Sequence, residues 1–179
     1  ITRQRIHVSD VSYSGMLRDS IGYIRHESFT DGGHRDFRKA FLDLKEKGAK
    51  HLVIDLRSNG GGLVDEAVKI LSLFFPKGTT VVTAKGRTPE SSFSMATQTE
   101  PLDTLIPITV LVNSASASAS EIVAGAIQDL DRGTIAGVRT YGKGLVQGLR
   151  PVGYNGNLKL TTAKYYTPSG RCVHAIDYS

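Results

Sequence analysis

The stretch Asn113 to Asp129, NSASASASEIVAGAIQD, joins a predicted strand to a predicted helix through a turn built only of Asn, Ser and Ala. The apolar run before it, Ile106 to Val112, has the length and the branched residues of a β-strand. After the turn, Ile122, Ala126 and Ile127 recur at helical spacing. Side chains this small allow a sharp bend at the start of the helix, where free N–H groups stabilise negative charge.

Ser118 in this turn has two interpretations that the segment alone leaves open. Ser118-x-x-Glu121 fits the S/T-x-x-E capping box, so the serine could simply cap the helix. The same hydroxyl could also be a nucleophile. A nucleophile needs a base, which must then come from elsewhere in the chain.

Length and composition predict one soluble globular domain. The chain has 179 residues, 40% of them hydrophobic and 22% charged, which is ordinary for such a domain. No apolar run approaches the roughly 18 residues of a membrane span. The net charge of +5 is scattered along the chain, which disfavours nucleic-acid binding, and the single cysteine excludes an internal disulfide. Because the chain begins at Ile1, we interpret it as a fragment, so a missing signal peptide carries no information.

Strands and helices alternate along the chain, which predicts an α/β fold with right-handed crossovers. Residues 51–56 form a near-continuous apolar run, typical of a strand covered on both faces. Residues 85–104 are polar and are expected to form a functional loop or a hairpin over the site. The expected helices are 34–47, 63–75 and 119–130, and the expected strands are two within 16–29, then 51–56, 79–84, 106–112, 133–138, 145–152, 158–166 and 171–176.

Two further turns carry unusual chemistry. Gly60-Gly61-Gly62 follows a predicted buried strand, and its uncovered N–H groups suit an oxyanion hole or an anion cradle. A flexible loop that needs positive φ angles is the alternative. Lys143 stands between Gly142 and Gly144, and its side chain is either solvated or directed inward.

Several common active-site motifs are absent or incomplete. Gly137-x-x-x-x-Gly142-Lys143 resembles the start of a P-loop, but Gly144 stands where Ser or Thr should hold Mg²⁺, and a strand pattern follows. The sequence contains neither an H-E-x-x-H zinc pair nor a G-x-S-x-G elbow. Cys172 and His174 lie in a late predicted strand, where packing is the simpler explanation. No metal site is expected.

If Ser118 reacts, a lysine is the plausible base. A lysine accepts a proton only when it is neutral, so its ordinary pKa of about 10.4 would have to fall to roughly 7–8. Burial among apolar groups lowers a lysine pKa, and a shift of this size corresponds to about 4 kcal/mol.

Three separated segments resemble the C-terminal processing peptidases, also called tail-specific proteases. These segments are DLRSNGGGL (Asp55 to Leu63), VNSASASASEIVAGAIQD (Val112 to Asp129) and TYGKGLVQ (Thr140 to Gln147). The resemblance covers nearly the whole chain and implies a crotonase-like or ClpP-like α/β core of ββα units, with a mixed sheet and flanking helices.

The same resemblance implies roles for individual residues. Ser118 would be the nucleophile, Lys143 the general base, and Gln147 the residue that orients the lysine. The N–H groups of Ala119 and Gly62 would form the oxyanion hole. Glu121 and Gly61 would support the site, and neither metal nor cofactor is implied.

The implied function is a serine endopeptidase that trims the C-terminal tails of proteins or peptides in a periplasm, cell envelope or thylakoid lumen. Members of this family usually carry a PDZ domain, which this chain lacks. Residues 1–14 are therefore expected to be an N-terminal segment, including the strand that leaves a PDZ domain, and residues 15–179 the catalytic domain. Ala115 also departs from a frequent Gly. A non-catalytic peptide-binding module is the alternative, and homo-oligomerisation stays open.

Overall fold

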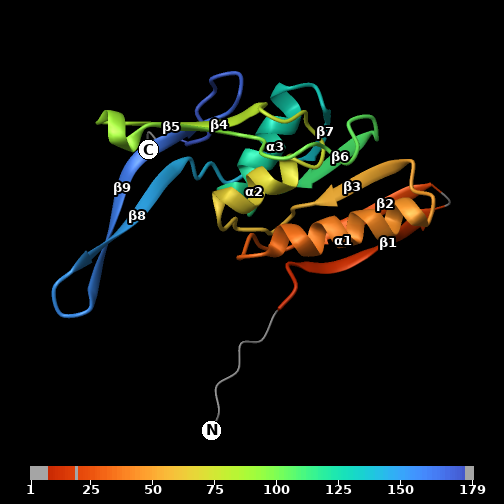
Figure 1. Cartoon of the computed structure of the whole chain (residues 1–179), viewed down its shortest axis with the longest axis horizontal. Helices are drawn as coiled ribbons and strands as arrows, with labels where there is room; N and C mark the ends of the chain where they lie inside the picture. The colour runs from red at the N-terminus through yellow and green to blue at the C-terminus, as the bar shows by residue number, and fades with distance from the viewer. Residues whose placement is uncertain (1–7, 19, 176–179) are drawn as a thin grey trace, which may run out of the picture.

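The computed structural model describes residues 8–18 and 20–175 of the chain. Residues 1–7 of the expected N-terminal segment fall outside this range. Two sheets make up the framework, one with five strands and one with four (Figure 1).

The five-stranded sheet is mixed and has the order β1-β2-β3-β6-β7. Its first pair is antiparallel, and the other neighbours run parallel. The strands are β1 (Val11–Arg18), β2 (Ile21–His26), β3 (His51–Asp55), β6 (Ile108–Val112) and β7 (Gly133–Gly137). β1 thus begins inside the segment that the sequence set apart from the catalytic domain.

The second sheet is antiparallel and has the order β5-β4-β9-β8. Its strands are β4 (Thr80–Gly86), β5 (Phe93–Ala96), β8 (Leu145–Val152) and β9 (Gly156–Tyr166), and the short 3-10 helix η1 (Pro89–Ser91) precedes β5. The polar stretch 85–104 therefore contains a hairpin. The β8–β9 hairpin projects away from the body of the protein (Figure 1). Its turn has positive φ at Tyr154 and Asn155, as a type I′ turn requires.

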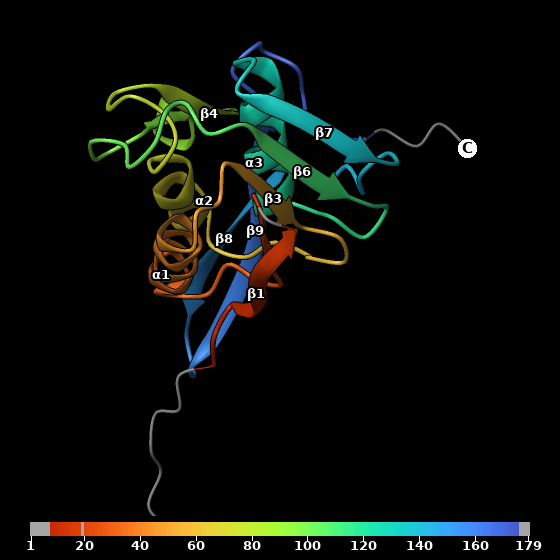
Figure 2. The ribbon, with the colours of Figure 1, turned by 90° about the vertical axis from the view of Figure 1, so that its right-hand side faces the viewer.

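Three helices connect the parallel strands: α1 (Gly33–Glu46), α2 (Val64–Leu71) and α3 (Ala119–Asp129). They lie on one side of the five-stranded sheet (Figure 2). α1 buries Phe37, Phe41 and Leu44 on one face, and Gly48 follows its end with φ 89°, as expected for a C-terminal glycine. α3 is buried along most of its length, because it contacts α2, β7 and β4 and so lies between the two sheets.

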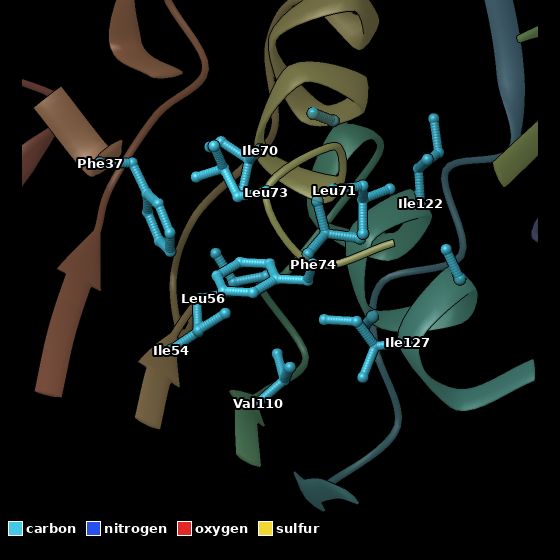
Figure 3. Packing of buried hydrophobic residues seen from close by; sticks show 14 of the residues in the cluster. Phe37, Ile54, Leu56, Ile70, Leu71, Leu73, Phe74, Val110, Ile122 and Ile127 are labelled. Carbon is cyan, nitrogen blue, oxygen red and sulfur yellow. The ribbon is translucent and has the colours of Figure 1, made fainter. Parts of the chain in front are cut away.

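Aromatic and branched side chains from the sheet and the helices form the core (Figure 3). Phe74 packs edge to face against Phe41, with ring centres 5.2 Å apart. Ile54 of β3 and Val110 of β6 are adjacent in the register and are both buried. Val53, between buried neighbours, is partly exposed. The prediction that β3 is covered on both faces is therefore wrong, because the helices cover one face only.

Two other elements differ from the sequence prediction. α2 ends at Leu71 rather than near residue 75, and the chain continues in turns whose apolar side chains still enter the core. The described residues of the predicted strand 171–176 form a single bridge, between Cys172 and Tyr166, instead of a strand.

Candidate active site

Ser118 lies at the junction between the turn after β6 and the first residue of α3, in a strained backbone conformation. Its φ is 57° and its ψ is −115°, values that L-residues other than glycine rarely adopt. Such a conformation costs about 1–3 kcal/mol and occurs preferentially at functional sites. The predicted capping box is also formed, so the serine caps α3 while a strained turn presents it. Its side chain is partly exposed.

The glycine turn packs directly against this serine turn. Gly61 has φ 96°, and a Cβ built on it would lie 2.6 Å from the carbonyl oxygen of Ala117 and 2.8 Å from Cβ of Ser118. Backbone atoms cannot move aside cheaply, so glycine is required here for both conformation and space. Two motifs that are more than 50 residues apart in sequence therefore meet.

Asn59, which is fully buried, holds the two turns together. Its carbonyl oxygen accepts hydrogen bonds from the N–H of Ala117 at 3.0 Å and from Oγ of Ser120 at 2.9 Å. Its side-chain Oδ1 accepts the N–H of Gly61 at 2.8 Å, and its Nδ2 donates to the carbonyl of His26 at 2.8 Å. The asparagine thus fixes the glycine turn against both the serine turn and β2.

The backbone pattern favours Gly62 over Gly61 as an oxyanion donor. The N–H of Gly61 is already bonded to Asn59. Phe29 donates to the carbonyl of Gly61 and accepts from the N–H of Leu63, so the N–H of Gly62 between them faces away from Phe29. Within the described part of the chain, the N–H groups of Gly62 and Ala119 have no acceptor. Both remain available to a ligand.

Glu121 joins the serine turn to the lysine turn. This carboxylate is 4% exposed and accepts four hydrogen bonds. Oε1 accepts from Oγ1 of Thr140 at 2.7 Å and from the N–H of Gly142 at 2.6 Å. Oε2 accepts from the N–H of Ser118 at 2.9 Å and from the N–H of Lys143 at 2.8 Å. Because they share one oxygen, the amides of Ser118 and Lys143 are at most two hydrogen-bond lengths apart.

The side chains of Lys143 and Gln147 are exposed in this structure. Among the residues described, neither Lys143 Nζ nor the Gln147 amide forms a hydrogen bond or ion pair, with the other or with Ser118. The three turns are thus brought together through their backbones. Of the two alternatives for the Lys143 side chain, solvated or directed inward, the structure has the solvated one.

Asp55 is a supporting residue whose role the sequence reasoning missed. Its buried carboxylate accepts from the hydroxyl of Tyr23 at 2.5 Å and from Nη2 of Arg57 at 2.7 Å. Burial alone would raise the pKa of Asp55, but these hydrogen bonds outweigh it and hold the pKa below its ordinary value. The anchor fixes the end of β3, where the glycine turn begins. An acidic residue inside the apolar run 51–56 was the available signal.

Comparison with known proteins agrees with this arrangement. The model of peptidase family S41 matches residues 20–178. A carboxy-terminal-processing protease of Bartonella bacilliformis is 43% identical over 180 residues, covering 98% of this chain and 41% of that protein. A carboxyl-terminal-processing protease of Synechocystis is 38% identical, with the same two coverages. The chain therefore spans about two-fifths of the length of these relatives.

The fold comparison gives the same family. The solved structure of a photosystem II D1 C-terminal processing protease superposes with a TM-score of 0.82 at 30% identity, covering 97% of this chain and 47% of that one. The predicted α/β class with a mixed sheet and flanking helices is confirmed. No helix within residues 8–18 and 20–175 is long and apolar enough to cross a membrane. The chain belongs to peptidase family S41, which confirms the resemblance to C-terminal processing peptidases and the assignment as a serine-type peptidase.

Proposed function

We propose that the protein is an endopeptidase that cleaves near the C-terminus of protein substrates through Ser118 and Lys143. One observation carries the proposal: the strained Ser118 and Lys143 donate their N–H groups to the same oxygen of Glu121. The names of the relatives, carboxy-terminal-processing proteases, support the choice of substrate end.

In the proposed reaction, unprotonated Lys143 takes the proton from Oγ of Ser118, and the oxygen attacks the peptide carbonyl. The C–N bond then breaks, and the lysine returns the proton to the leaving amine. Water releases the acyl-enzyme by the same route. Because Glu121 anchors the lysine backbone close to the serine backbone, we propose that the lysine side chain rotates to bring its amine to the hydroxyl. Gln147, four residues further along the chain on β8, is proposed to orient that amine.

The tetrahedral intermediate needs donors for its oxyanion. We assign the N–H groups of Ala119 and Gly62, which have no acceptor within the described residues. Loss of one such donor typically lowers the rate by about 10²–10³. Substrate is proposed to bind as an extended strand on an open sheet edge, which gives affinity with little sequence preference. A PDZ domain in the full-length protein and a periplasmic or cell-envelope location complete the proposal.

A non-catalytic peptide-binding module is the second candidate, and the exposed side chain of Lys143 favours it. Labelling by a fluorophosphonate separates the two. In the full-length protein, we expect covalent labelling of Ser118 and cleavage of an unfolded substrate. Both should be lost in Lys143→Ala and kept in the control Lys50→Ala, which alters an exposed lysine between α1 and β3.

Circular dichroism should give the same spectrum for both variants and the wild type. Full activity of Lys143→Ala would exclude the dyad. Peptide binding without labelling or cleavage in the wild type would establish the binding module instead.

A further inference from the structure

A shallow groove of about 310 Å³ lies on the second sheet, next to the lysine turn. Leu145, at its edge, follows Lys143 by two residues. The N–H of Tyr165 donates to the carbonyl of Gly144 at 2.7 Å, which fixes β9 against this turn. The groove is lined by Lys85, Gly86, Arg87, Leu145, Thr161, Thr162, Ala163 and Lys164.

Three cations line this groove, and no carboxylate does. Lys85 of β4 and Lys164 of β9 are direct partners in the antiparallel register, so their side chains lie on the same face of the sheet. Like charges placed directly opposite each other destabilise a sheet. Within the described part of the chain, neither they nor Arg87 forms an ion pair. The positive charge is therefore uncompensated.

A contact with an aromatic ring fixes the position of Lys85 in this groove. Nζ of Lys85 lies 4.8 Å from the ring centre of Tyr166, over its face. This contact is a cation–π interaction and holds the ammonium on the groove side of β4. Leu145 is the cross-strand neighbour of Lys164 and provides an apolar surface beside the charges. A negative group attached to a partly apolar chain fits this combination.

We infer that the groove binds a carboxylate of the peptide substrate close to the bond that is cleaved. The inference rests on the proposed function, because it takes the neighbouring turns as the reaction centre. A peptide can supply the carboxylate as an Asp or Glu side chain or as its free C-terminus, and both carry the chemistry that lysine and arginine bind. Because the cations are exposed, the preference should weaken as salt is added.

The test compares the full-length wild type with the double variant Lys85→Ala/Lys164→Ala. Lys159→Ala is the matched control, since it removes an exposed lysine of the same strand β9 outside the groove. Three peptides share one sequence: the first is neutral with an amidated C-terminus, the second has a free C-terminus, and the third is amidated and carries Glu in place of one Gln. The measured quantity is kcat/KM at low ionic strength.

We expect wild type and Lys159→Ala to cleave at least one carboxylate peptide on the order of tenfold faster than the neutral peptide, and the double variant to lose this ratio. The peptide that shows the ratio identifies the source of the carboxylate. Equal rates on all three peptides, or a ratio retained in the double variant, would overturn the inference.

Failure of the proposed function gives a different result. No peptide would then be cleaved, and Ser118 would take no fluorophosphonate label. Fluorescence anisotropy of the three labelled peptides then measures their affinities and tests carboxylate binding in the groove independently of cleavage. The inference is supported if a carboxylate peptide binds more tightly than the neutral one and this preference disappears in the double variant. Equal binding of all three peptides refutes the inference.

Discussion

Replacing Glu121 with glutamine should separate the serine and lysine turns while leaving the shape of the side chain unchanged. The new amide nitrogen fits best opposite Thr140, because a hydroxyl can turn to accept. The N–H of Gly142 then faces a second donor. A buried donor left unsatisfied costs about 1–3 kcal/mol, and loss of the charge also weakens the bonds from Ser118 and Lys143. We therefore expect Glu121→Gln to lower the free energy of unfolding by about 2–4 kcal/mol.

Urea unfolding measures this free energy, and fluorophosphonate labelling measures the reactivity of Ser118. The control is Glu66→Gln. Glu66 is 1% exposed and accepts from His34 and Lys69, so it faces α1 rather than the turns. Burial alone would raise the pKa of Glu66, but the hydrogen bonds from these two residues lower it to about 2. Both variants should lose stability, and only Glu121→Gln should label more slowly under conditions where both are folded.

Two results would refute the reasoning about Glu121. A free energy of unfolding within about 0.5 kcal/mol of the wild type would mean that the carboxylate does not hold the turns. Equal slowing of the labelling in Glu66→Gln would mean that lost stability, and not separation of the turns, explains the change at Ser118.

Two further predictions concern the glycine turn and the buried histidine. Gly61→Ala should lower the free energy of unfolding by more than about 2 kcal/mol, because its Cβ would meet backbone atoms, whereas Gly60→Ala meets nothing within 4 Å and should be nearly neutral in thermal unfolding. Burial lowers the pKa of His26 from 6.5 to about 4, so the unfolded chain binds this proton more readily. Stability should then fall by about 3 kcal/mol as the pH drops from 6.5 to 4, and a His26→Leu variant with an unchanged slope in that range would contradict this.

The sequence predicted the elements whose signals are local. The helical spacing after Ser118 and the strand patterns at 145–152 and 158–166 depend on neighbouring residues, and the structure has α3, β8 and β9 at or close to the expected bounds. The apolar run 51–56 was misjudged because such a run does not say how many faces are covered. That depends on where the helices pack.

For the candidate site, the sequence identified the three turns but not the hydrogen bonds that join them. The three motifs identify the turns, but nothing in the pattern of Glu121 says that one carboxylate accepts from both Ser118 and Lys143. The role of Asn59 could not be predicted either, since it depends on burial and on partners that are distant in sequence. The exposed position of the Lys143 side chain also depends on its surroundings in three dimensions, which the Gly-Lys-Gly pattern leaves undetermined.

Under the proposed function, the backbone angles at Ser118 favour one residue for stability and another for chemistry. A residue without Cβ would adopt φ 57° and ψ −115° at little steric cost, so the Ser118→Gly chain should tolerate heat better than the native one. Under the proposed function, directed evolution that selects only for thermal tolerance would accordingly accept glycine at this position and lose the nucleophile. Any engineering of the chain therefore has to score turnover in every round.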